Sequence, residues 1–299
     1  MRTEMEVIKE ILEWAKRQEK VRAVLLTGSR ANPGAFTDIL SDYDVIFVVN
    51  DLPEYAGDDS WVSKFGEVIT FFKDEFIWKE HGGVKTYTRL MQYSDGIRID
   101  FSLWPIELLE LISETKTLPD SLDIGYKVLL DKDRLTKELK PPTHRAYDIS
   151  PPTEAEFLTQ VREFWWDITY VPKALWRDEL FFAKYMMEHI RFGFFEKVLN
   201  WYIGMRHNWS VNPGKHGRWY KHYLEPELYE RLEKTFFGSE LKENLDAMFQ
   251  LIELFRYFGI ELAKSLGYNY PMHLDEKVSK YITAIEKLSR NAKERSAGF

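Results

Sequence analysis

The segment Asp42-Tyr43-Asp44-Val45-Ile46-Phe47-Val48-Val49 decides how the first half of this chain folds. Its last five residues are apolar without interruption, which is typical of a strand that is buried on both faces of a sheet. Because side chains alternate along a strand, Asp42 and Asp44 point to the same side of it, about 6 to 7 Å apart. Two carboxylates placed in this way can bind a divalent cation from one side.

Two further parts of the pattern lie before and after this segment. Residues 21–27 form another aliphatic and β-branched run, which ends at Gly28-Ser29-Arg30. In such a turn, exposed backbone N–H groups and a hydroxyl can hold phosphate oxygens, and a glycine lets the backbone approach closely. Residues 97–104 alternate between apolar and polar side chains, so Asp100 is expected on the wet face of its strand.

The order of these residues is more informative than any one of them. A Gly-Ser pair usually just ends a strand, an isolated Asp-x-Asp is usually a solvated loop or a helix cap, and a single Asp on a strand is usually at the surface. In this order they predict a metal-dependent nucleotidyl-transfer site. The predicted catalytic and metal-binding residues are Asp42, Asp44 and Asp100, and the predicted nucleotide contacts in the turn are Gly28, Ser29 and Arg30.

The rest of the N-terminal half reads as a mixed sheet with few helices. Thr3-x-x-Glu6 is a capping box, and the apolar stripe that follows it predicts an amphipathic helix packed on the sheet. The Asp95-Gly96 turn lies between two alternating runs and predicts a hairpin. Further strand signals cover residues 67–72, 86–93 and 126–131.

The composition of the chain changes at two proline pairs. Pro141-Pro142 and Pro151-Pro152 bracket a polar stretch that cannot continue regular structure. We therefore expect a nucleotidyltransferase domain at 1–140, a linker at 141–152 and a helical domain at 153–299. Four to six helices fit the last segment, the longest at 239–266. The predicted fold class is α+β, with a mixed-sheet domain followed by an all-α domain.

The motifs also resemble a known family. Gly-Ser, then Asp-x-Asp, then a distant third carboxylate is the signature of the polymerase-β-like nucleotidyltransferase superfamily. Narrower motifs in both halves look like the aminoglycoside 6-adenylyltransferases, the streptomycin-modifying enzymes. These motifs include Leu26-Thr27-Gly28-Ser29-Arg30, Val128-Leu129-Leu130-Asp131-Lys132-Asp133, Glu163-Phe164-Trp165-Trp166, Tyr170-Val171, Leu175-Trp176-Arg177 and Gly214-Lys215.

This resemblance implies a reaction. The nucleotide is expected to be ATP, and the transferred group AMP, attached to the 6-hydroxyl of streptomycin with release of pyrophosphate. Two Mg²⁺ ions, about 3.5 to 4 Å apart, would be held by the predicted carboxylates. Asp100 is in addition a candidate general base for the acceptor hydroxyl.

The helical half is expected to supply cations for the triphosphate and a surface for the acceptor. Lys215 and Lys221 follow the turn at 212–214, where a loop can cover a ligand, and Lys173 belongs to a family motif. Any one lysine on a helix is more often simply solvated. For the acceptor, the resemblance and the aromatic spacing select Glu163, Trp166, Tyr170 and Glu179.

Composition narrows the functional classes. The net charge of −7 disfavours a nucleic-acid partner and suits an enzyme that recruits small cationic molecules. There are no cysteines, so a disulfide framework or thiolate site is excluded. Neither a signal peptide nor a membrane-spanning run of about 18 apolar residues is recognised. We expect a cytoplasmic enzyme with no membrane contact and no obligate protein partner.

Three alternatives remain open at this point. The acceptor could be a protein side chain or an RNA end, although an RNA acceptor would call for a basic groove. It could also be another hydroxylated cationic metabolite. The third alternative is a non-catalytic nucleotide-binding module, which the presence of all three carboxylates disfavours.

Overall fold

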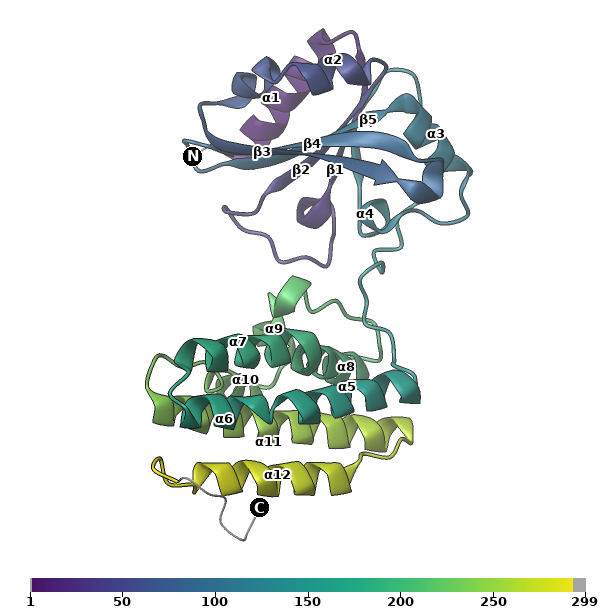
Figure 1. The fold of residues 1–299 in the computed structure, drawn as a ribbon. Coiled ribbons are helices and arrows are strands. Elements are labelled where there is room, and N and C mark those ends of the chain that lie inside the picture. The colour runs from purple at the N-terminus through teal and green to yellow at the C-terminus, as the bar shows by residue number, and fades with distance from the viewer. Residues whose placement is uncertain (1, 293–299) are drawn as a thin grey trace. The chain divides into compact units, whose positions relative to one another are not determined.

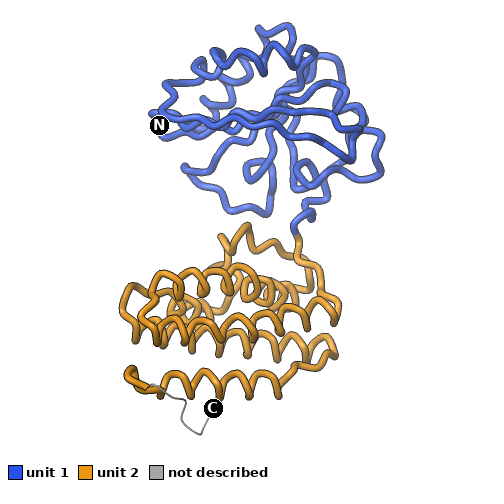
Figure 2. Tube along the Cα trace, viewed as in Figure 1, with its two compact units in different colours: residues 1–147 blue, residues 148–299 orange. Residues whose placement is uncertain are grey.

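The computed structural model describes residues 2–292. The chain forms two compact units, residues 1–147 and residues 148–299, and the division falls within the proline-rich stretch 141–152 (Figure 2). The first unit is built around a sheet and the second is helical (Figure 1). The predicted α+β class is therefore confirmed.

A six-stranded mixed sheet forms the core of the first unit. Its strands lie in the order β3-β4-β5-β2-β1-β6, and β2 and β5 are parallel whereas the other neighbouring pairs are antiparallel. The strands are β1 (Val21–Thr27), β2 (Tyr43–Val49), β3 (Val68–Trp78), β4 (Val84–Tyr93), β5 (Arg98–Pro105) and β6 (Lys127–Asp131). The continuous apolar run on β2 occupies a central position, as its burial on both faces requires.

The predicted hairpin joins β4 to β5. Tyr93 donates its backbone N–H to the carbonyl of Ile97 at 2.8 Å, and Gly96 supplies the positive φ that the turn needs. The hairpin sets Leu90 opposite Asp100. Strand β3 continues six residues beyond the predicted end at 72. The prediction stopped early because β3 is an edge strand, and its largely exposed side chains include charged ones that interrupt the apolar alternation.

Helices cover one face of the sheet more completely than the other. Helix α1 (Glu4–Arg17) begins at the predicted capping box and buries Val7 and Ile11 against strand residues such as Phe47. Helix α2 (Leu52–Gly57) and the 3₁₀ segment Ser60–Phe65 also supply residues to this apolar cluster. On the opposite face, α3 (Ile106–Glu114) and α4 (Asp120–Asp123) pack over Ile46, Val48 and Trp104, and part of that face stays open.

The second unit is a bundle around one apolar core. Its α-helices within the described residues are α5 (Glu154–Asp167), α6 (Tyr170–Trp176), α7 (Leu180–Ile190), α8 (Glu196–Arg206), α9 (Tyr220–Tyr223), α10 (Pro226–Glu233), α11 (Leu241–Leu266) and α12 (Met272–Glu286). The predicted number of four to six helices was wrong. The apolar pattern predicts longer continuous helices than the structure contains. Two interruptions divide them: Asp178, which has a φ of +63°, and the π-helical turn Arg191–Phe195.

The longest helix is α11, as predicted. No helix within residues 2–292 has both the length and the apolar character needed to span a membrane.

Candidate active site

Two of the three predicted carboxylates lie side by side. Asp44 on β2 is directly opposite Asp100 on the parallel strand β5, and on its other side Asp44 is opposite Thr27 of β1. All three residues project from the face that α3 and α4 leave partly open. The parallel pairing of β2 and β5 therefore brings together two acids that are 56 positions apart in the sequence.

The turn after β1 closes over Asp44. Gly28 has φ of +65°, and a Cβ atom at this position would lie 2.0 Å from Oδ2 of Asp44. Both the backbone conformation and the space therefore require glycine here. Residues Gly28–Arg30 form one 3₁₀ turn, and Ser29 in its middle is half-buried. The predicted phosphate-binding turn thus lies directly against the partly buried carboxylate of Asp44.

Arg30 supports the segment that carries Asp42. Its guanidinium donates to the backbone carbonyls of Ser41 at 2.7 Å and Asp42 at 3.2 Å, and it lies 3.9 Å from the centre of the Tyr43 ring. It also forms an ion pair with Glu4 at 2.8 Å. These contacts fix the approach of the chain to β2, so the Arg30 side chain positions Asp42.

Arg98 was not selected from the sequence, and it is a cation that faces these acids. Its guanidinium holds both carboxylate oxygens of Asp100, at 2.9 and 3.0 Å, and lies 3.5 Å from Oδ2 of Asp42. In the described part of the chain, no three His, Cys, Asp or Glu side chains are gathered as a ready metal site. The alternation of 97–104 did indicate that Arg98 and Asp100 share a face, and this i, i+2 relation was the available signal.

The electrostatic environment of Asp44 is unfavourable for a carboxylate. Burial raises the pKa of Asp44 to about 6, and the negative charges of Asp100 and Asp42 add to this rise, while Arg98 opposes it. A divalent cation would relieve this repulsion. The close approach at Gly28, the paired acids and the raised pKa together fit a bound metal ion.

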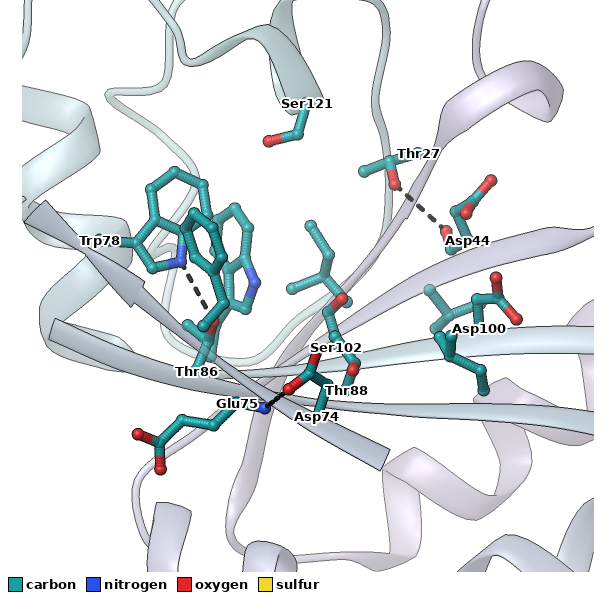
Figure 3. Close-up of a pocket in the computed structure, with 15 residues that line it drawn as sticks. Thr27, Asp44, Asp74, Glu75, Trp78, Thr86, Thr88, Asp100, Ser102 and Ser121 are labelled. Atoms are coloured by element: carbon teal, nitrogen blue, oxygen red, sulfur yellow. Dashed lines mark hydrogen bonds between the residues drawn. The ribbon is translucent and has the colours of Figure 1, made fainter. Parts of the chain in front are cut away.

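A hollow of about 370 Å³ extends from the two acids across the open face of the sheet. Figure 3 shows Asp44 and Asp100 at one end of the hollow and Trp78 at the other. Trp78 donates its indole N–H to the hydroxyl of Thr86 at 3.1 Å, which fixes the orientation of the ring. None of the other lining residues was selected as a site residue from the sequence, because most of them come from strands whose pairing decides what they face.

The predicted lysines lie in the helical unit. Lys173 on α6 is 4.3 Å from the centre of the Tyr170 ring, and burial, with a smaller contribution from Arg177, lowers its pKa. Lys215 and Lys221 are both exposed, and Lys221 lies 5.8 Å from the centre of the Tyr229 ring.

The predicted acceptor residues lie on, or next to, the first three helices of that unit. Glu163 and Trp166 are exposed and three positions apart on α5, so they share a face. Tyr170 begins α6, and Glu179 stands just before α7, 3.9 Å from Arg177. The structure thus brings Glu163 near Trp166 and Tyr170 near Lys173 in the helical unit, and Asp44 to Asp100 in the first unit.

The paired acids on neighbouring strands and the glycine turn against them are the features of a nucleotidyltransferase, and this is the class of enzyme to which the protein belongs. The comparisons with known proteins are more specific. Residues 1–285 match the family model described as streptomycin adenylyltransferase, and the chain belongs to that family.

Named relatives extend over nearly the whole chain. An aminoglycoside 6-adenylyltransferase of Campylobacter jejuni is 35% identical over 287 residues, which are 96% of this chain and 97% of the relative. One of Staphylococcus aureus is 30% identical over 287 residues, 94% of this chain and 98% of the relative. A crystal structure of an aminoglycoside 6-adenyltransferase from Bacillus subtilis is 27% identical, with 96% and 100% coverage and a TM-score of 0.47.

Proposed function

We propose that this enzyme transfers AMP from ATP to a hydroxyl group of an aminoglycoside, the 6-hydroxyl of streptomycin, in a Mg²⁺-dependent reaction that releases pyrophosphate. The observation that carries the proposal is the family match over residues 1–285, together with relatives named aminoglycoside 6-adenylyltransferase at 30 and 35% identity. The cytoplasm is the proposed location of the reaction, since it contains ATP and Mg²⁺.

Asp42, Asp44 and Asp100 are the proposed metal-binding residues. When bound, two Mg²⁺ ions would lower the pKa of the acceptor hydroxyl and neutralise the charge that develops on the departing pyrophosphate. The raised pKa of Asp44 supports this assignment, because the site keeps a carboxylate where its charge is unfavourable without a cation.

The other residues of the first unit have simpler proposed tasks. The backbone N–H groups and the hydroxyl of Gly28-Ser29 hold phosphate oxygens, close to Asp44. Asp100 accepts the proton of the attacking hydroxyl. Arg30 positions the Asp42 segment through its contacts with backbone carbonyls.

In the helical unit, we assign Lys173, Lys215 and Lys221 to the triphosphate. The depressed pKa of Lys173 supports its assignment, since a partly desolvated ammonium group gains more from a phosphate partner than a solvated one does. The acceptor contacts proposed for this unit are Glu163, Trp166, Tyr170 and Glu179.

The experiment is a transfer assay. Purified protein is incubated with Mg²⁺, ATP and streptomycin, and pyrophosphate release is followed together with the mass of the drug. We expect a mass increase of one AMP on streptomycin, and no pyrophosphate without an acceptor. Other aminoglycosides serve as parallel acceptors. If none of them gains AMP, the proposed function is wrong, whereas transfer to another aminoglycoside alone would correct the acceptor.

A further inference from the structure

The hollow beside the paired acids has a composition suited to a particular kind of molecule. Its floor is the open face of strands β2 to β5, and the cross-strand register fixes which side chains stand there. One row of this face contains Asp44 and Asp100. The next row, two residues further along the strands, contains Asp74, Thr88 and Ser102, which are opposite one another on β3, β4 and β5. All five residues line the hollow.

The second row offers polar groups that the protein itself leaves unused. Among the residues that the structure describes, the hydroxyls of Thr88 and Ser102 have no hydrogen-bond partner. The Asp74 carboxylate accepts one hydrogen bond, from the backbone N–H of Glu75 at 2.8 Å, and within residues 2–292 no cation pairs with it. Figure 3 shows Asp74 and Thr88 close together in the middle of the hollow.

The neighbouring acid on the same strand is different. Glu75 also borders the hollow, but its side chain points to the other face of β3, as adjacent strand residues do, and its carboxylate pairs with Lys85 at 2.9 Å. Figure 3 shows its carboxylate directed away from Ser102 and Thr88. The two acids are thus equal in charge and adjacent in sequence, and only Asp74 shares the face of the catalytic acids.

An aromatic wall closes the far end of the hollow. Trp78 packs edge to face on Trp104, with ring centroids 5.1 Å apart, and Trp104 itself is buried. An indole held in one orientation offers a flat apolar surface to a ring. A row of free hydroxyls, one unpaired carboxylate and an aromatic wall are together complementary to a polyhydroxylated ring that carries a positive charge.

We propose that this hollow is the acceptor subsite of the first unit, and that Asp74 determines specificity by binding a cationic group of the acceptor. This inference rests on the proposed function, which supplies a polyhydroxylated cationic acceptor. Asp74 is two strands and one row away from Asp100, so the cationic group lies roughly 10 to 12 Å from the reacting hydroxyl. Thr88 and Ser102 lie along that path and bind hydroxyls of the same molecule.

The test compares Asp74→Asn with Glu75→Gln, which removes an equal charge from the same strand on the other face. With streptomycin as acceptor, we expect Asp74→Asn to raise the KM for streptomycin about tenfold, the size of one charge-assisted hydrogen bond. The KM for ATP should stay within twofold of wild type. Glu75→Gln should change neither value by more than twofold, and Asp74→Glu should recover part of the lost affinity.

Ionic strength provides a second readout that a change in strand stability would not affect. The KM of wild type for streptomycin should rise with added salt, and that of Asp74→Asn should rise less steeply. Equal KM values for streptomycin in wild type and Asp74→Asn, or a change in the KM for ATP instead, would overturn the subsite while leaving the proposed function intact. If wild type modifies no aminoglycoside, the proposed function fails and the subsite fails with it.

Discussion

Two aspartates, Asp44 in the first unit and Asp275 in the second, have opposite surroundings. Asp275 on α12 is 1% exposed and fully partnered, since Arg256 donates to both of its oxygens at 2.6 and 2.7 Å and Tyr270 and Ser279 donate at 3.0 and 3.1 Å. Asp44 lies beside two like charges, and no hydrogen-bond donor to its side chain is found among the described residues.

This difference separates a carboxylate that stabilises the fold from one for which we propose a role in catalysis. A buried charge is tolerated when donors surround it, as they do Asp275. Placing Asp44 against Asp100 lowers the stability of the isolated protein, because two like charges repel. A cation bound between them would remove this repulsion and would explain the arrangement. The two residues should therefore respond in opposite ways to the same kind of substitution.

The largest effect should be on turnover. We expect Asp44→Asn to lower kcat/KM for AMP transfer by about a thousandfold or more, because one charge contact to the transition state is worth that much. Circular dichroism should show a folded protein. Turnover is measured by pyrophosphate release under saturating Mg²⁺ and ATP, and near-normal transfer by this variant would contradict a metal-binding role for Asp44.

Next in size is the loss of stability in the helical unit. Asp275→Ala should lower the free energy of unfolding by about 3 kcal/mol, because it leaves the partly buried Arg256 without its counter-ion. Urea denaturation measures this quantity. At temperatures where the variant is folded, its KM for ATP should match that of wild type. A decrease in the free energy of unfolding below about 1 kcal/mol would show that the ion pair between Asp275 and Arg256 stabilises the protein no more than an exposed salt bridge does.

The sequence predicted the acidic centre better than its surroundings. Asp42, Asp44 and Asp100 were found because strand alternation and an uninterrupted apolar run are local signals. Arg98 lay in the same alternating segment, yet its two-oxygen contact with Asp100 depends on a rotamer that no pattern specifies. Asp74 was outside every predicted strand, because charged residues at an exposed edge interrupt the apolar alternation.

The helical unit shows the same limit in another form. Its longest helix, α11, was predicted from local pattern. The break at Asp178 was not, because a positive φ at a non-glycine residue is set by packing of the flanking helices. Tertiary context also separated Trp165, which is buried, from its exposed neighbour Trp166.

A smaller effect, in the opposite direction to that at Asp275, is expected for Asp44 in the absence of metal. A carboxyl whose pKa is raised to about 6 in the folded protein favours folding in its protonated form, and this contribution is lost as pH rises from about 4 through 6. Asp44→Asn does not ionise, so it should be more stable than wild type at pH 8. At pH 4 the free energies of unfolding of Asp44→Asn and wild type should be nearly equal.

Thermal or urea unfolding of both proteins between pH 4 and pH 8, in buffer with a chelator, measures this difference. Added Mg²⁺ should then stabilise wild type at pH 8 and leave Asp44→Asn nearly unchanged, since ligand binding to the native state raises its stability. A variant less stable than wild type at pH 8 would show that the charge of Asp44 is well accommodated.

The smallest change in the free energy of unfolding should come from substituting Arg98 in the first unit. Arg98 holds Asp100 by two hydrogen bonds, just as Arg256 holds Asp275, but its side chain is 41% exposed and its partner belongs to the proposed metal site. Arg98→Met should therefore lower the free energy of unfolding by less than about 1 kcal/mol.

Arg98→Met should also tighten Mg²⁺ binding severalfold, because it removes a positive charge that competes for Asp42 and Asp100. Calorimetric titration with Mg²⁺ at pH 8 measures that affinity, with Arg177→Met in the helical unit as the matched control. Weaker Mg²⁺ binding would mean that Arg98 organises the acids for the ion, and the contrast between a replaceable and a structural counter-ion would no longer hold.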